Sequence, residues 1–245
     1  MQEWKTPPGA ANNLCISLLK QPHALIAGST GSGKSVLINS IIYTALYQPP
    51  NRAKLILIDP KRVELYRYKN IPHALIYATE TPDIMRALCD SIEIMERRYK
   101  AMQRRGQLKS TDSDIYIIID EYADLMTTEK KAVTPLICRI AQLGRAANIH
   151  LILATQRPTR DIITGQIKVN LDSRVALRCP SPQDSRNIID VKGAETLPRY
   201  GYGYYLTPEY GLQLVNIPFT DPQEINARVQ WWINQAPRKR FILKA

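Results

Sequence analysis

The sequence predicts an α/β fold, in which helices cover both faces of a mostly parallel β-sheet. Short apolar runs alternate along the chain with longer segments of helical period, and this alternation is typical of strand–helix units. The apolar runs, such as IYIII at residues 115–119, contain no alternating polar residues, as expected for strands buried on both faces. We expect strands at Ala24–Ala27, Lys54–Asp59, Ile115–Asp120, His150–Thr155 and Arg174–Cys179.

Helical segments fill most of the chain between these strands. Four apolar residues of the second segment recur at three- and four-residue steps, so we expect them to face the core. They are Met85, Leu88, Ile92 and Met95. After Gly201 the pattern changes to two β-rich runs separated by turn residues, which predicts a β-hairpin at the sheet edge. Helices are expected at Lys34–Tyr47, Pro82–Arg105, Lys130–Ala147, Gln183–Val191 and Asp221–Asn234.

Composition narrows the classes of function. The 245 residues are 44% apolar, which excludes a chain that is disordered throughout. Lysine and arginine number 33 against 22 acidic residues, and a net charge of +11 favours a polyanion such as nucleic acid, with an acidic membrane surface as the rival partner. No run approaches the roughly 18 apolar residues of a membrane span, so we expect a cytoplasmic protein. The four cysteines form no C-x-x-C pair, so no zinc site is expected.

Residues 28–35 read GSTGSGKS and lie between the first predicted strand and the first predicted helix. In this context the pattern predicts a P-loop, whose backbone N–H groups and helix N-terminus bind the phosphates of ATP. We expect Lys34 to reach the β- and γ-phosphates and Ser35 to bind Mg²⁺. The alternative is a plain Gly/Ser-rich turn before a helix. The predicted ATP-binding residues are Gly28, Ser29, Thr30, Gly31, Ser32, Gly33, Lys34 and Ser35.

Two acidic residues, Asp120 and Glu121, follow the third predicted strand. Because parallel strands end at the same edge of a sheet, both carboxylates are expected near the P-loop. Asp120 is then placed to hold Mg²⁺ through water, and Glu121 to polarise the water that attacks the γ-phosphate. The alternative is a solvated acidic strand end. With Glu121 present, we expect an enzyme that hydrolyses ATP.

Two further polar residues are candidates for catalysis. Gln156 ends the strand that we expect between the P-loop strand and the Asp120 strand, so it is a candidate sensor of the γ-phosphate. Arg145 falls at the end of a predicted helix, from which it could reach the γ-phosphate of a neighbouring subunit. Taken alone, Arg145 fits equally well as a charge that complements the helix dipole.

Several of these motifs occur in an order that resembles the motor domain of the FtsK/SpoIIIE family of DNA translocases. The segments are IAGSTGSGKS, ILIDPKRVELYRYKNIPH, ERRYKAM, IIIDEYADLM and LGRAANIHLILATQRPTRDIITGQIKVN, followed by DSR and KGAE. The match runs from Gln21 to Phe219 and implies a RecA-like fold, with a hexameric ring of identical subunits around double-stranded DNA. It also implies ATP sites at subunit boundaries, with Arg145 as the arginine finger. Arg157 and Lys168 are then expected on loops that face the DNA.

The resemblance also covers Asp59 and Lys61 of the IDPK segment, for which a salt bridge at the strand end is the alternative. The chain departs from the family pattern at Pro182, where some relatives have a basic residue, and in LPRYGYGYY after GAE. Only about twenty residues precede the match, and the segment after it is short for a winged-helix domain. We therefore expect neither an anchor at the septum nor a domain that reads DNA sequence.

These observations predict an ATP-driven translocase of double-stranded DNA that uses Mg²⁺. We expect an N-terminal extension at residues 1–20, a motor domain at 21–236 and a basic tail at 237–245. Two alternatives stay open. The first is a motor of protein secretion with a polypeptide substrate, because some relatives in the family drive secretion. The second is a ring that clamps DNA under the control of ATP without moving along it.

Overall fold

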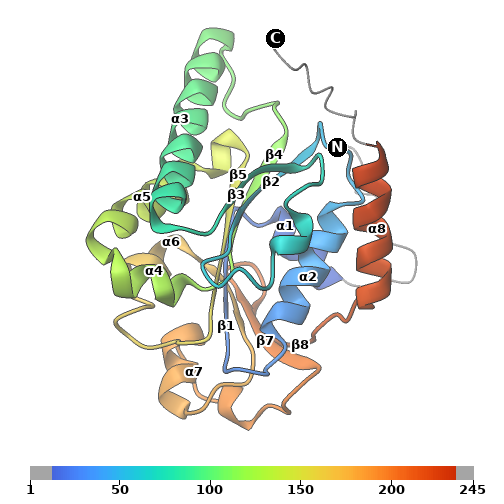
Figure 1. The fold of residues 1–245 in the computed structure, drawn as a ribbon. Helices are drawn as coiled ribbons and strands as arrows, with labels where there is room; N and C mark the ends of the chain where they lie inside the picture. Colours follow the sequence, from blue (N-terminus) through green and yellow to red (C-terminus); the bar gives the residue numbers. More distant parts are fainter. Residues whose placement is uncertain (1–12, 236–245) are drawn as a thin grey trace.

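The computed structural model describes residues 13–235, which form one sheet with helices on both faces (Figure 1). Its strands lie in the order β3-β2-β4-β5-β1-β6-β7-β8. The pairs from β3 to β6 are parallel, whereas β7 is antiparallel to both of its neighbours. The strands are β1 (His23–Ala27), β2 (Ala53–Ile58), β3 (Ala74–Ala78), β4 (Asp114–Ile119), β5 (Ile149–Thr155), β6 (Ser173–Ala176), β7 (Tyr202–Thr207) and β8 (Gly211–Asn216). The predicted fold class is confirmed.

The helices are α1 (Asn13–Lys20), α2 (Lys34–Ala45), α3 (Thr81–Arg105), α4 (Tyr122–Thr128), α5 (Lys130–Leu143), α6 (Gly165–Asn170), α7 (Pro182–Ile189) and α8 (Pro222–Gln235). They form two layers, because successive residues of a buried strand point to opposite faces of the sheet. In β1, Leu25 and Ala27 pack with α3 to α7, whereas Ala24 and Ile26 pack with α1, α2 and α8 (Figure 1). Both faces of the central strands are therefore buried, as the unbroken apolar runs predict.

Helix α5 ends earlier than the sequence predicts. The expected helix Lys130–Ala147 stops at Leu143, and a separate 3₁₀ turn follows at Arg145–Ala147. A Cβ at Gly144 would lie 2.5 Å from the carbonyl oxygen of Ile149, so only glycine fits where the chain turns back into β5. The prediction that Arg145 belongs to the helix is thus wrong, since it begins the turn after α5.

Some short elements carry too little pattern to be predicted. Strand β3 lies at the sheet edge with Leu75 exposed, and no strand is expected there from the sequence. Helices α1, α4 and α6 have eight residues or fewer and are likewise not predicted. The other predicted strands and helices agree with the observed bounds to within three residues.

The strand order brings the predicted motifs together. Strand β5 lies between β4 and β1, and all three run parallel, so their carboxyl ends meet at one edge of the sheet. The P-loop follows β1, Asp120 and Glu121 follow β4, and Gln156 follows β5. Ligands of open α/β sheets bind outside this edge.

The predicted division of the chain stays a prediction. Helix α1 falls within the expected extension at residues 1–20, and its Leu14, Leu18 and Leu19 are buried in the core beside α2. The predicted tail at 237–245 lies outside the described residues. Within residues 13–235, no helix is both long enough and apolar enough to cross a membrane.

Candidate nucleotide-binding site

The P-loop has the backbone conformation that its glycines permit. Gly31 has a φ of 74° and Gly33, which caps α2, has a φ of 95°, a region in which other residues are strained. The start of the loop is held by the segment that follows β6, because both the backbone nitrogen and the hydroxyl of Ser29 donate to the carbonyl oxygen of Arg178, at 2.9 and 3.0 Å. The loop is therefore fixed above the N-terminus of α2.

Lys34 and Asp120 form a buried ion pair at the base of the loop. The Lys34 ammonium, with 3% of its side chain exposed, donates to a carboxylate oxygen and to the carbonyl oxygen of Asp120, both at 2.7 Å. Burial raises the pKa of the Asp120 carboxyl, Lys34 opposes the rise, and the carboxylates of Glu64 and Asp59 add to it. The cation predicted for phosphate is thus held beside the carboxylate predicted for Mg²⁺.

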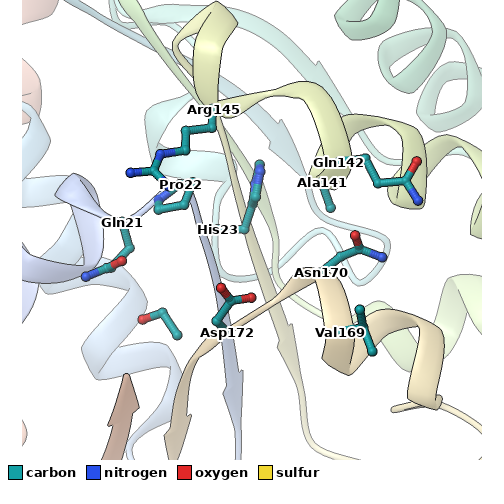
Figure 2. A pocket seen from close by; sticks show the side chains of 10 residues that line it. Gln21, Pro22, His23, Ala141, Gln142, Arg145, Val169, Asn170 and Asp172 are labelled. Atoms are coloured by element: carbon teal, nitrogen blue, oxygen red, sulfur yellow. The ribbon is translucent and has the colours of Figure 1, made fainter. Parts of the chain in front are cut away.

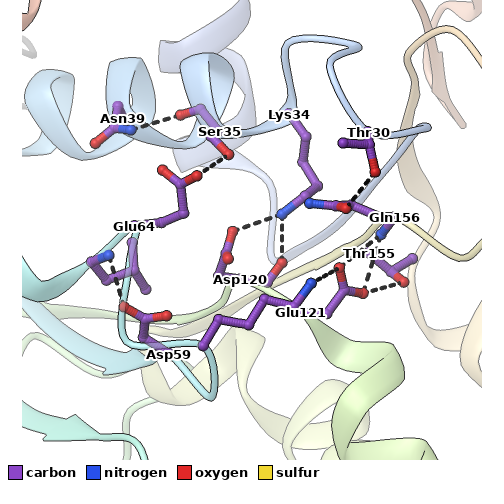
Figure 3. A network of polar contacts seen from close by, with 12 residues as sticks. Thr30, Lys34, Ser35, Asn39, Asp59, Glu64, Asp120, Glu121, Thr155 and Gln156 are labelled. Atoms are coloured by element: carbon purple, nitrogen blue, oxygen red, sulfur yellow. Dashed lines mark hydrogen bonds and ion pairs between the residues drawn. The ribbon is translucent and has the colours of Figure 1, made fainter.

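Glu121 is held by contacts to both of its carboxylate oxygens (Figure 3). The Thr155 hydroxyl donates to Oε1 at 2.7 Å, and the backbone N–H of Gln156 lies 3.1 Å from both oxygens. Lys61 Nζ lies 3.4 Å from Oε2. With 2% of its side chain exposed, Glu121 is a buried carboxylate whose orientation is fixed by β5. The alternative of a salt bridge between Asp59 and Lys61 is not found among residues 13–235, where Lys61 pairs with Glu121 instead.

Gln156 connects the end of β5 to the P-loop. Its side-chain oxygen accepts a hydrogen bond from the Thr30 hydroxyl at 2.9 Å (Figure 3). The sequence predicts Gln156 at this edge but gives no sign of a role for Thr155, whose hydroxyl contacts Glu121. Only the neighbouring positions of β4 and β5 reveal that contact.

Ser35 and Asp120 provide the hard oxygen donors that Mg²⁺ prefers. The Ser35 hydroxyl donates to Glu64 Oε1 at 2.7 Å, so a further carboxylate lies beside the predicted ligand. Glu64 lies in the ILIDPKRVELYRY segment, yet nothing in the sequence pairs it with Ser35. No group of three His, Cys, Asp or Glu side chains within residues 13–235 is arranged to hold a metal. The Ser35 hydroxyl and the Asp120 carboxylate are oxygen donors that fit a Mg²⁺ whose other ligands come from phosphates and water.

The chain matches the sequence model of a known protein family. The model of the FtsK/SpoIIIE family matches residues 6–114 and 107–160, which together cover more than half of the chain. The chain belongs to the FtsK/SpoIIIE family. It is 41% identical to the DNA translocase FtsK of Pseudomonas syringae pv. syringae, over 88% of this chain and 32% of that protein. The corresponding values for Pseudomonas aeruginosa are 40%, 89% and 32%, so the chain spans about a third of these relatives.

Solved structures support the same fold. The pCW3 conjugation coupling protein TcpA, in a monomer form with ATPγS, has a TM-score of 0.77 and 25% identity, over 87% of this chain and 66% of that one. The cytoplasmic domain of the type VII secretion ATPase EccC of Thermomonospora curvata has a TM-score of 0.73 and 22% identity, over 87% and 28%. Its family and its P-loop make this FtsK/SpoIIIE protein an ATPase that binds ATP.

In this FtsK/SpoIIIE protein, Arg145 lies at the opposite edge of the sheet from the P-loop. It lines a pocket with Gln21, Pro22 and His23 at the start of β1 (Figure 2). The five residues of β1 separate that edge from the P-loop by roughly 16 Å. Burial, together with the neighbouring His150, lowers the pKa of His23 to about 3, so His23 is neutral beside Arg145. Arg145 is too distant to contact phosphates in its own P-loop, and its action on a neighbour stays a prediction.

The two residues that the resemblance assigns to DNA differ in their surroundings. Arg157 follows β5 and is exposed, as expected. Lys168 lies in the last turn of α6, where its ammonium pairs with Asp190 and donates to the carbonyl oxygen of Arg186. The prediction of an exposed Lys168 in a loop is therefore wrong, because the α6–α7 contact holds it half-buried. Contact of either residue with DNA stays a prediction.

Proposed function

We propose that this protein is the motor of a translocase that uses ATP hydrolysis to move double-stranded DNA through a hexameric ring. The proposal rests chiefly on its identity of 40–41% with proteins named DNA translocase FtsK, over nearly nine tenths of this chain. The excess of basic residues over the whole chain agrees with a DNA partner.

In the proposed reaction, the P-loop binds the phosphates of ATP and Lys34 balances their negative charge. Bound Mg²⁺ supplies further positive charge at the phosphates, and Ser35 and Asp120 are the residues that would hold it. Glu121 accepts hydrogen bonds from the Thr155 hydroxyl and the Gln156 backbone N–H, which orient its carboxylate to polarise the attacking water. Gln156 contacts Thr30 of the P-loop, which suits a residue that responds to the γ-phosphate.

Arg145 is proposed to act in trans. It lies on the surface at the amino edge of the sheet, away from the P-loop of its own subunit. In a head-to-tail ring, each such edge faces a different surface of the next subunit. An arginine supplied there would stabilise the charge that develops on the neighbour's γ-phosphate.

The proposed DNA contacts include a basic groove of about 580 Å³ beside α6 and α7. Four basic side chains line it, namely Arg160, Lys168, Arg174 and Arg186. Asp190 pairs with Lys168 and Arg174, while Arg160 and Arg186 have no ion-pair partner among residues 13–235. Free guanidinium groups in a groove suit phosphate oxygens, which they can contact in a bidentate manner. No motif in the sequence marks Arg160 or Arg186 as a DNA contact.

The decisive experiment measures steady-state ATP turnover with and without double-stranded DNA, together with displacement of a third strand from a DNA triplex. A translocase shows turnover that DNA stimulates and triplex displacement that requires ATP. A motor for protein secretion shows no response to duplex DNA. A clamp controlled by ATP binds DNA but displaces no third strand, so each outcome separates the proposal from one alternative.

Two pairs of substitutions test where the DNA binds. If both members of a pair contact phosphates, replacing both by alanine lowers the slope of log affinity against log salt by roughly 2. One pair is Arg157→Ala with Lys168→Ala, and the other is Arg160→Ala with Arg186→Ala. Because Asp190 already neutralises Lys168, we expect the second pair to lose more affinity. Arg52→Ala, at an exposed arginine before β2, is the control for the loss of one positive charge away from β6.

A further inference from the structure

The segment LPRYGYGYY, which departs from the family pattern, brings Arg199 to the P-loop. If Gly31 carried a Cβ, that atom would lie 2.9 Å from Arg199 Nη2, 3.4 Å from Nε and 3.6 Å from Cζ. The guanidinium therefore occupies the space beside the glycine that a longer side chain would fill. Gly31 has a positive φ and belongs to the loop whose N–H groups are predicted to bind phosphate.

The backbone around Arg199 is fixed on both sides. Leu197 is buried in the core two residues before it, and the carbonyl oxygen of Gly201, two residues after it, accepts from the Ile217 nitrogen at 2.9 Å. The preceding turn is also tied to the segment that follows β6, since Cys179 N donates to the carbonyl oxygen of Ala194. The same segment holds the P-loop through Arg178, so one stretch of chain positions both.

The charge of Arg199 is not neutralised within residues 13–235. No carboxylate or hydrogen-bond acceptor there contacts its guanidinium, and its nearest aromatic contact is the Tyr200 ring at 5.5 Å. Lys34, by contrast, is already paired with Asp120. A guanidinium beside N–H groups and a helix N-terminus is unfavourable unless an anion lies between them, because all of these groups carry positive charge.

We propose that Arg199 contacts the phosphate groups of the bound nucleotide in its own subunit. An arginine fork matches phosphate oxygens and forms charge-assisted hydrogen bonds with them. Arg199 would then be a second cation of the ATP site, reaching the phosphates from beside Gly31. The inference rests on the ATPase activity and does not depend on DNA translocation.

The test compares nucleotide binding by wild type, Arg199→Ala, Arg199→Lys and Arg52→Ala, in the absence of DNA. A partly exposed charge-assisted bond predicts that Arg199→Ala weakens binding of both ATPγS and ADP about tenfold. Arg199→Lys should retain part of the affinity, and Arg52→Ala should bind as wild type does. The slope of log affinity against log salt should also fall for Arg199→Ala, whereas its melting temperature without nucleotide should not change.

Affinity within about twofold of wild type for Arg199→Ala would overturn the inference, and so would tighter binding, which would mean that Arg199 obstructs the empty loop. Arg199→Gln answers the same question if the alanine variant is unstable. Because these measurements contain no DNA, their outcome is independent of the triplex assay. A failure of DNA translocation therefore leaves the role of Arg199 testable.

Discussion

Replacing Thr155 by valine should impair hydrolysis without impairing ATP binding. Thr155 is fully buried at the end of β5, where its hydroxyl donates to Glu121 Oε1 at 2.7 Å and accepts from the Arg157 nitrogen at 3.1 Å. Valine keeps the shape of the side chain but replaces the hydroxyl by a methyl group. Glu121 Oε1 then keeps one donor within residues 13–235, the backbone N–H of Gln156.

The size of the effect follows from these contacts. Losing the hydroxyl leaves the partly buried Arg157 N–H without this partner and removes a donor from a buried carboxylate, which costs about 1–3 kcal/mol of folding free energy. A carboxylate that is free to shift by about 1 Å predicts a kcat lower by roughly 10- to 100-fold. KM for ATP should change little, because Glu121 acts on the attacking water and not on bound phosphate.

Steady-state ATPase assays on purified Thr155→Val check this expectation, with Thr155→Ser as the matched control. Serine keeps the hydroxyl and loses only a methyl group, so it should recover most of the lost kcat. The reasoning would be refuted by a valine variant with kcat within about twofold of wild type. It would equally be refuted by a serine variant as impaired as valine, since packing and not the hydrogen bond would then matter.

Three further predictions address the site and the fold. Lys34→Ala should lose ATP binding and turnover. Glu121→Gln should bind ATPγS normally but hydrolyse ATP at least about 100-fold more slowly. Normal ATP turnover by Glu121→Gln would remove Glu121 from the mechanism. Arg145→Ala and Glu121→Gln subunits should each be inactive alone. In a random 1:1 mixture, about a quarter of the subunit boundaries should again combine an intact Glu121 with an intact Arg145, so activity should partly return. Co-assembly without such recovery would exclude action in trans. Burial lowers the pKa of His23 to about 3 and that of His73 to about 4, so the unfolded chain binds more protons below pH 6.5. The free energy of unfolding should therefore fall as the pH drops from 6.5 towards 4, by roughly 1 kcal/mol per pH unit for each histidine. Denaturant unfolding would contradict this if the free energy stayed constant over that pH range.

The helix that precedes Arg145 illustrates where sequence patterns fail. The apolar period from Lys130 continues through Ala147, and nothing local marks its end before Gly144. What ends α5 is the close approach of the Ile149 carbonyl oxygen to Gly144, a contact between the end of the helix and the start of β5. Periodicity reports burial along one helix, whereas such a contact depends on the path of the chain after it. Strand β3 fails for a related reason, because its pairing with β2 and not its composition makes it a strand.

The sequence by itself determined the α/β class, the P-loop, the acidic pair Asp120–Glu121 and the family resemblance, because each depends on residues close together in the chain. Apolar runs fix strands, and glycines at fixed spacing fix a loop whose chemistry needs no distant partner. Only the tertiary structure decided the contacts across the sheet edge: Thr155 with Glu121, Glu64 with Ser35, and Arg199 with Gly31. The two residues of each pair lie on different elements that are distant in the chain. Strand order and register bring them within hydrogen-bond or contact distance, and both depend on the packing of the whole sheet.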